Sequence, residues 1–353
     1  MPDSLPLMTP DAPINQEPPL AALDTPLTHT DIFFTRNNGT LPPSHPDWTL
    51  AVTGLVARPQ RLTPAALRAR FATVELTSVL ECAGNGRSAI TPPVDGLPWG
   101  LGAVGCARWT GVRLADVLAE AGLDPAATHV GFLSPDHAIG QPGVPALSRG
   151  LPIAKAQAAE TLIAFAMNGA PLTPLHGAPL RVVAPGYPGS AWQKWLREIV
   201  VLDREHDGAK MTGLDYRMPR TPLRPGEDHA GVAFDVITDM PVKSLITAPL
   251  EGFSAPGPIA LRGFAWSGHI PLARVDVSAD GGESWQPAQL EPATEAWAWR
   301  RFTAWLSAPP GPVEVLARAT DAAGNAQPMQ PVWNPRGYLN NAVHRVRGEV
   351  RAG

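Results

Sequence analysis

The sequence has little of three things that often define a class of protein: cysteine, charge and long apolar runs. Its 353 residues include only two cysteines, Cys82 and Cys106, which cannot build the disulfide framework of a small secreted scaffold. Charged residues make up 17% of the chain, below the usual ~25%. The 28 basic and 32 acidic residues give a net charge of −4, without the basic excess of nucleic-acid or anionic-membrane binders. We therefore expect neither nucleic acid nor a membrane as a partner.

Targeting and cofactor signals are scarce as well. No apolar run reaches the roughly 18 residues of a membrane-spanning helix. The start, M-P-D-S-L-P-L-M, lacks a basic segment followed by an apolar one. We therefore predict no export signal and a cytoplasmic location, or a periplasmic one if a signal was removed. The patterns C-x-x-C-H, H-E-x-x-H and G-x-G-x-x-G do not occur, so the sequence lacks the usual marks of covalent haem, zinc proteases and dinucleotide binding.

Proline is what the sequence has in excess, with 41 of 353 residues, about 12% against a usual ~5%. Disorder requires low hydrophobicity and high net charge, whereas 44% of this chain is hydrophobic and its net charge is small. We predict a globular, loop-rich protein. Residues 1–27 are expected to form a proline-rich arm that is poorly ordered or draped over the surface.

Helix and strand patterns alternate over residues 28–235, which predicts an α+β protein whose first domain is mixed α/β. The clearest helix covers residues 110–122, where apolar residues recur at i, i+3, i+4 and i+7 before Gly122. A shorter helix is expected to begin at Thr63-Pro64. The predicted strands are the apolar runs at residues 48–56, 74–80, 129–133, 161–167, 180–184 and 199–202.

The pattern changes at about residue 236 to short alternating runs without a convincing helix. Turn sequences such as Asp280-Gly281-Gly282 and Ala323-Gly324-Asn325 separate these runs. The predicted strands lie at residues 259–266, 273–279, 298–305 and 313–319. We therefore predict that residues 236–353 form an Ig-like all-β sandwich.

The segment L-E-C-A-G-N-G-R-S at residues 80–88 presents Cys82 at the end of a predicted strand, on a loop with two glycines. A nearby positive charge lowers the pKa of a thiol, so Arg87 is expected to favour a thiolate there. The alternative is that Cys82 is a small buried apolar residue, as most free cysteines are. The glycines and the arginine favour the functional interpretation.

This segment resembles the C-A-G-N-x-R motif of the sulfite oxidase family of molybdenum enzymes. Further segments resemble other motifs of the family in the same order, over about residues 30–350. That collinearity is more specific than any one motif. The further segments are Ile32-Phe33-Phe34-Thr35-Arg36-Asn37-Asn38, Ala107-Arg108-Trp109-Thr110-Gly111-Val112, Met167-Asn168-Gly169, His176-Gly177-Ala178-Pro179-Leu180-Arg181-Val182-Val183, Lys194-Trp195-Leu196, Trp297-Ala298-Trp299-Arg300 and Trp333-Asn334-Pro335-Arg336-Gly337.

The resemblance implies one molybdenum per chain, held by the dithiolene of one molybdopterin and by the thiolate of Cys82, with no haem. Soft sulfur suits such a metal. Cys106 stands where the family needs no thiol, and we interpret it as structural. The resemblance also implies a homodimer formed through the sandwich.

The implied reaction is oxidation of sulfite to sulfate by oxygen-atom transfer, with electrons passed to an external acceptor such as a cytochrome or oxygen. Arginine suits an oxyanion pocket because its charge is permanent and its planar fork offers several donors. The alternative for each arginine is a solvated surface charge or a structural ion pair. By motif position, the resemblance assigns catalytic roles to Arg36, Arg87, Arg336, Tyr216 and Trp109, the last as part of the pocket wall.

The resemblance also assigns residues to the pterin and its phosphate. His176 and Arg181 correspond to an anchoring pair, and Lys194, with the loop before it, corresponds to a second phosphate and pterin clamp. The predicted cofactor-binding residues are Phe34, Asn38, Asp136, His176, Arg181, Ser190, Trp192 and Lys194.

Two substitutions and one absence depart from the family pattern. Asn38 replaces the histidine of R-N-H, and Gly86 replaces an arginine found in many members. No cytochrome b5-like segment precedes the molybdenum domain, which is why we expect an external electron acceptor.

Three alternatives stay open. A nitrate reductase-like molybdenum enzyme shares the expected fold, although Tyr216 and Arg336 favour sulfite. A single-domain relative that reduces sulfoxides would lack the sandwich. A metal-free Ig-like binding protein would have no need to keep a joint set of residues, which here is Cys82, His176, Arg181 and Lys194.

Overall fold

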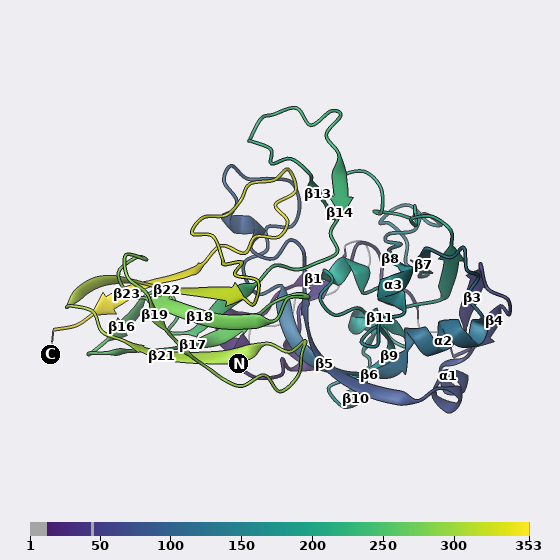
Figure 1. The fold of residues 1–353 in the computed structure, drawn as a ribbon, viewed down its shortest axis with the longest axis horizontal. Coiled ribbons are helices and arrows are strands. Elements are labelled where there is room, and N and C mark those ends of the chain that lie inside the picture. The colour runs from purple at the N-terminus through teal and green to yellow at the C-terminus, as the bar shows by residue number, and fades with distance from the viewer. Residues whose placement is uncertain (1–12, 44–45, 353) are drawn as a thin grey trace.

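The computed structural model describes residues 13–43 and 46–352, which form two lobes side by side (Figure 1). The first lobe holds the α-helices and two sheets, and the second is built of strands. Among the described residues from 236 onward there is no helix, as the sequence predicts. None of the helices in the described ranges is long and apolar enough to cross a membrane.

The sheet that positions Cys82 has five strands, in the order β10-β9-β6-β5 with β11 beside β9. All of its pairings are antiparallel. The strands are β5 (Thr73–Glu81), β6 (Val104–Arg113), β9 (Leu162–Met167), β10 (Ala170–Pro171) and β11 (Arg181–Val183). The predicted strand at residues 74–80 is confirmed by β5, which ends one residue before Cys82.

The second sheet of the first lobe has the order β4-β3-β12-β7-β8. It is mixed, because β12 runs parallel to β3 and antiparallel to β7. Its strands are β3 (Leu50–Gly54), β4 (Gln60–Leu62), β7 (His129–Leu133), β8 (Gly150–Pro152) and β12 (Glu198–Leu202). The runs predicted at residues 48–56, 129–133 and 199–202 are therefore strands.

The α-helices are α1 (Pro64–Arg70), α2 (Leu114–Ala121) and α3 (Ile153–Ala156). The predicted start of α1 is confirmed, since the Thr63 hydroxyl accepts a hydrogen bond from the Ala66 amide at 3.1 Å. The prediction for α2 was wrong at its beginning. Residues 110–113 extend β6, where they pair with β5 and β9 on both sides, and this pairing outweighs the local helical spacing.

The second lobe is a sandwich of a four-stranded sheet, β15-β17-β21-β20, and a five-stranded sheet, β16-β23-β22-β18-β19. Buried aliphatic side chains of both sheets form its core. The predicted turn at residues 280–282 joins the antiparallel strands β18 and β19. The strands are β15 (Lys243–Ala248), β16 (Phe253–Ala255), β17 (Ile259–Trp266), β18 (Leu272–Ser278), β19 (Gln286–Pro287), β20 (Gln289–Leu290), β21 (Arg300–Leu306), β22 (Gly311–Asp321) and β23 (His344–Val350).

Two short strand pairs complete the fold. The first pairs β1 (Asn15–Gln16) with β2 (Thr35–Arg36), and the second pairs β13 (Arg217–Pro219) with β14 (Phe234–Val236). The second pair projects between the two lobes in Figure 1 and lies on the connection from the first lobe to the sandwich.

The described part of the proline-rich arm is draped over both lobes, and residues 1–12 lie outside the described residues. The Glu17 carboxylate accepts hydrogen bonds from the amides of Gly100 and Gly102, at 2.7 and 2.9 Å, in the first lobe. Further along the arm, Asp24 pairs with Arg301 of the sandwich at 2.7 Å. These contacts make residues 13–27 a strap across the two lobes.

Candidate active site

Cys82 lies at the end of β5 in a tight turn. Its amide donates to the carbonyl oxygen of Ala103 at 2.9 Å, and its own carbonyl accepts from the Asn85 amide at 2.9 Å. The side chain is buried but lines two neighbouring hollows of the surface. A thiol held in this way can reach a ligand in either hollow.

The two hollows, named here the inner and the outer cleft, meet at Cys82, Arg36 and Tyr216, which line both of them. The inner cleft encloses about 680 Å³ and the outer cleft about 550 Å³. The inner cleft is lined by all eight predicted cofactor-binding residues: Phe34, Asn38, Asp136, His176, Arg181, Ser190, Trp192 and Lys194. The outer cleft is lined by four of the five predicted catalytic residues: Arg36, Arg87, Tyr216 and Arg336.

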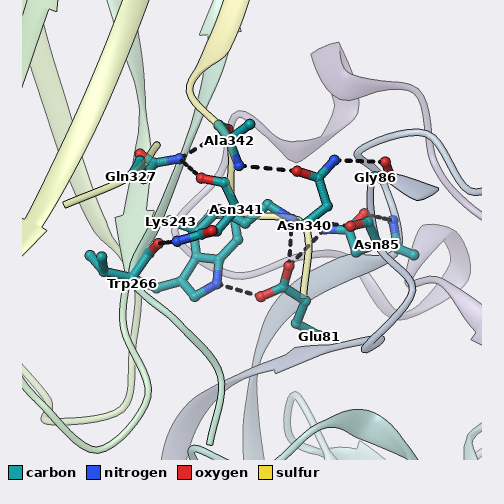
Figure 2. A network of polar contacts seen from close by, with 12 residues as sticks. Glu81, Asn85, Gly86, Lys243, Trp266, Gln327, Asn340, Asn341 and Ala342 are labelled. Carbon is teal, nitrogen blue, oxygen red and sulfur yellow. Dashed lines mark hydrogen bonds and ion pairs between the residues drawn. The ribbon is translucent and has the colours of Figure 1, made fainter. Parts of the chain in front are cut away.

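A buried ion pair holds the start of the Cys82 turn against the sandwich (Figure 2). The Glu81 carboxylate accepts from Lys243 Nζ at 2.8 Å and from Asn85 Nδ2 at 3.0 Å. Its other oxygen accepts from Trp266 Nε1 at 2.8 Å. Lys243 and Trp266 belong to the sandwich, so the second lobe fixes the residue that precedes Cys82.

The end of the same turn is held by a second set of contacts, also drawn in Figure 2. Asn340 Nδ2 donates to the Gly86 carbonyl at 2.8 Å. Its neighbour Asn341 donates to the Val242 carbonyl at 3.1 Å, and Gln327 donates to the Asn341 carbonyl at 2.9 Å. The turn is therefore anchored to the sandwich at both ends.

Burial is the main influence on the pKa values of the two cysteine thiols. Burial raises the pKa of Cys82, while Arg36 and Arg87 act in the opposite direction without outweighing it. The expected effect of Arg87 on the pKa of Cys82 is therefore present, although burial outweighs it in the free thiol. Cys106 is completely buried beside Leu23 and Trp299, and burial raises its pKa to about 12. This environment fits the structural role expected of Cys106.

Arg181 is a buried cation on the floor of the inner cleft. Its guanidinium donates to the carbonyls of His176 and Trp192, at 3.0 and 3.2 Å, and lies 4.9 Å from the centre of the Trp109 ring. Burial lowers the pKa of Arg181 to about 9. Within the described ranges Arg181 forms no salt bridge, so its charge has no protein counterion.

Lys194 and His176 line the same wall of the inner cleft as Arg181. Lys194 Nζ donates to the Leu175 carbonyl at 3.0 Å and to Asn37 Oδ1. Burial and the nearby Arg181 hold the pKa of Lys194 well below its usual value. Burial lowers the pKa of His176 to about 4, so at neutral pH this ring is uncharged, and its Nε2 lies 3.0 Å from the Thr30 carbonyl oxygen.

The chemistry of this wall fits an anionic, hydrogen-bonding group. Arg181 is buried and Lys194 is partly buried, and among the described residues the one carboxylate that lines this cleft is Asp136, whose pKa is itself raised by burial. Ser190 Oγ and Asn37 Nδ2 are buried there without a hydrogen-bond partner among the described residues. Isolated buried charges and unpaired polar atoms are costly, and a phosphate-bearing ligand would satisfy both.

Trp109 is the one predicted site residue that lines neither cleft, so the expectation that it shapes the substrate wall is not what the structure shows. Its ring is fully buried, edge-on to Trp192 with centroids 5.7 Å apart, and lies beneath Arg181. The β6 strand turns this side chain into the core of the first lobe. Trp109 therefore supports the floor of the inner cleft.

Two arginines of the outer cleft have donors to spare. Arg87 donates from Nε to the Arg336 carbonyl at 2.8 Å and from Nη1 to the Leu97 carbonyl at 2.6 Å. No hydrogen bond within the described chain uses its Nη2. Arg336 Nε is likewise unpartnered there, and its Nη2 lies 3.7 Å from Asp215. These donors are available for a bound anion.

Several residues of the clefts carried no signal that the sequence analysis recognised. Tyr338, two residues after Arg336, stacks on Tyr216 with ring centroids 5.5 Å apart. Its position beside the W-N-P-R-G motif could have suggested it. Asn37 stood inside a matched motif, whereas no motif surrounds Lys210, which also lines the outer cleft.

The fold and the paired clefts together define a molybdopterin-binding oxidoreductase domain joined to a dimerisation domain. Residues 38–210 match the family described as oxidoreductase molybdopterin binding domain. Residues 234–351 match the family described as Mo-co oxidoreductase dimerisation domain.

The chain belongs to the sulfite oxidase family of molybdopterin oxidoreductases. It is 38% identical to mitochondrial sulfite oxidase of Rattus norvegicus, over 96% of the chain and 64% of that protein, so it spans somewhat less than two thirds of the rat protein. Identity to sulfite oxidase of Gallus gallus is also 38%, over 94% of the chain and 75% of that protein. A nitrate reductase of Hordeum vulgare is 32% identical, over 96% of the chain and 41% of that protein.

A solved structure has the same architecture. The sulfane dehydrogenase SoxCD from Paracoccus pantotrophus superposes with a TM-score of 0.77 at 26% sequence identity. The superposition covers 95% of this chain and 86% of that one. Both lobes of the present structure are therefore included.

Proposed function

We propose that this protein oxidises sulfite to sulfate by oxygen-atom transfer at a molybdopterin-bound molybdenum and passes the electrons to an external acceptor. One observation carries the proposal: Cys82 lies where a basic inner cleft meets an outer cleft lined by arginines. Sulfite oxidases among the relatives of the chain support this choice of substrate.

In this proposal the inner cleft holds the cofactor. Arg181, Lys194 and Ser190 bind its phosphate, and the Cys82 sulfur is the protein ligand of the metal. When bound, the molybdenum centre supplies exchange of an oxygen atom and two electrons, while the protein supplies binding and orientation. The polar network of Glu81 and Lys243 orients Cys82 before the metal arrives.

In the outer cleft, Arg87 and Arg336 bind the sulfite oxygens with the donors that the protein leaves unused, and Arg36 adds a third positive charge. Backbone carbonyls already hold Arg87 in place, so little reorganisation is needed when the anion enters. The Tyr216 hydroxyl is a further hydrogen-bond donor to the reacting oxygen. Together these side chains hold the substrate in the outer cleft, next to Cys82.

The partners of the reaction belong to the same proposal. The electron acceptor is a separate cytochrome or oxygen, and the protein acts without a haem of its own. The family match of residues 234–351 supports a homodimer formed through the sandwich. Sedimentation at micromolar concentration measures this directly, and a monomer would count against it.

Metal content and a sulfite titration test the function. Purified protein is expected to contain about one molybdenum per chain, to release a fluorescent pterin on denaturation, and to lose its sulfur-to-metal absorption band on adding sulfite. Cys82→Ser should abolish turnover by removing the thiolate ligand. Cys106→Ala is the matched control: it removes the other buried cysteine and should keep the metal and the band.

Two results would contradict the proposal. The absence of molybdenum and pterin from the native protein would exclude the proposed molybdenum-dependent activity. Rapid reoxidation of the reduced protein by nitrate, with no response to sulfite in the oxidised protein, would point to a nitrate reductase instead.

A further inference from the structure

Arg149 is a buried cation that the proposed function does not use. Only 1% of its surface is exposed, and it lines neither cleft. It is absent from the salt bridges of the described residues, and its Nε has no hydrogen-bond partner there. Its guanidinium makes two contacts, a hydrogen bond to the Lys210 carbonyl and a face-on approach to the Tyr216 ring, 5.2 Å from the ring centre. A charge buried at such cost calls for an explanation other than stability.

Both contacts of Arg149 fall on one strained segment. Lys210 and Tyr216 have φ angles of +65° and +55°, in the left-handed region that non-glycine residues avoid. Residues in such conformations persist only where their surroundings hold them. Arg149 holds the beginning and the end of this segment, residues 210–216, which also carries Asp215 next to Arg336.

The same guanidinium is the first member of a four-layer stack. Arg149 lies over Tyr216, Tyr216 is stacked on Tyr338 with their planes 17° apart, and Arg87 lies 5.3 Å from the centre of the Tyr338 ring. Tyr216, Tyr338 and Arg87 line the outer cleft, and Arg149 closes the stack from inside the protein. Cations bind aromatic faces, so Arg149 stabilises the position of Tyr216 and Arg87 that of Tyr338.

We propose that Arg149 is a positioning residue that fixes residues 210–216 and thereby holds Tyr216 in place for the substrate. The inference rests on the proposed function, because the role of Tyr216 does. Removing Arg149 releases a strained segment and takes away no contact to a predicted cofactor-binding residue. The effect therefore falls on substrate binding rather than on the metal.

The experiment compares Arg149→Met, Arg149→Lys and the control Arg345→Met in the metal-loaded protein. Arg345 is a partly buried arginine of the sandwich, paired with Glu314 at 2.7 Å. We expect R149M to keep its molybdenum content and its sulfur-to-metal band, and to lose at least tenfold in kcat/KM for sulfite, mainly through KM. R149K keeps the charge without the planar fork and should recover part of the loss, while R345M should match the parent protein.

A double-mutant cycle with Tyr216→Phe separates positioning from general destabilisation. If Arg149 acts through the Tyr216 hydroxyl, adding R149M to Y216F should change kcat/KM less than twofold. An undiminished tenfold loss in that background would overturn the inference. So would R149M protein that melts at lower temperature yet keeps the parent kinetics.

Failure of the inference and failure of the proposed function give different results. A parent protein without molybdenum, or without sulfite turnover, overturns the function and this inference with it. Full activity of Y216F overturns the inference alone and leaves sulfite oxidation standing.

Discussion

At the scale of single residues, Gly86 shows how a departure from a family motif can be required by the backbone. Its φ is +86°, and a Cβ atom at this position would lie 2.9 Å from Asn340 Nδ2. Asn340 is the side chain that holds the Gly86 carbonyl. An arginine at this position would therefore conflict with both the conformation and the anchor of this turn.

Gly86→Ala is expected to destabilise the protein by roughly 1–2 kcal/mol from the left-handed conformation alone, with an added cost from the contact with Asn340. Gly252→Ala is the matched control, because Gly252 has a φ of +78° and nothing within 4 Å of the added Cβ. Chemical denaturation of both variants measures the difference. Equal losses would show that the Asn340 contact has no energetic weight.

Motifs located most of the candidate site because the residues that line the clefts occur in recognisable segments. Arg181 and Lys194 are examples, since they come from two separate motifs and line one cleft. Trp109 stood in a motif as well, but the direction of its side chain depends on the register of β6, which the motif does not encode. The proposed role of Arg149 could not be predicted from the sequence, since it depends on the conformation of residues 210–216 in three dimensions.

At the scale of elements, β5 was predictable from its apolar run, whereas the long strand β6 was not. Residues 104–113 contain two glycines and two arginines, and their strand conformation comes from pairing on both sides. The sandwich was easier to predict from the sequence, because short alternating runs between turns are typical of that fold. Its contribution to the Cys82 turn could not be predicted, because it depends on how the lobes pack.

The ion pair at the end of β5 is expected to be strongly coupled. Both side chains are 3–4% exposed, so Lys243→Met leaves an uncompensated Glu81 carboxylate and should cost about 3–5 kcal/mol. The double variant Glu81→Gln with Lys243→Met removes both charges and should recover much of that loss. Arg220→Met breaks the exposed pair with Asp235 and should change little.

Unfolding curves of the parent, the two single variants, the double variant and the Arg220→Met control, with molybdenum content for each, measure this coupling. Additive losses from Glu81→Gln and Lys243→Met would mean that the two charges do not interact. Unchanged metal content in Lys243→Met would mean that the pair stabilises the lobes without orienting Cys82.

At the scale of the whole molecule, buried neutral histidines make stability depend on pH. Burial lowers the pKa of His129 and of His344 to about 4. Each Nδ1 accepts a backbone hydrogen bond, from the amides of His206 at 3.1 Å and Ile246 at 3.0 Å, which protonation would break. The unfolded chain takes up these protons near pH 6.5, so stability is complete above that pH and falls as pH drops toward 4.

His344 alone should account for about 2 kcal/mol of lost stability at pH 5. His344→Asn keeps an acceptor for the Ile246 amide and cannot be protonated, so its melting temperature should vary less with pH than that of the parent. His229→Asn changes an exposed histidine and is the control. A parallel pH dependence in His344→Asn and the parent would reject this origin.

The strap formed by residues 13–27 has a consequence for the order of events during synthesis. This segment is synthesised before its partners in both lobes. Gly100, whose amide donates to Glu17, follows Glu17 by 83 residues, and Arg301, the partner of Asp24, follows Asp24 by 277 residues. The strap can therefore dock completely only when most of the chain has been made.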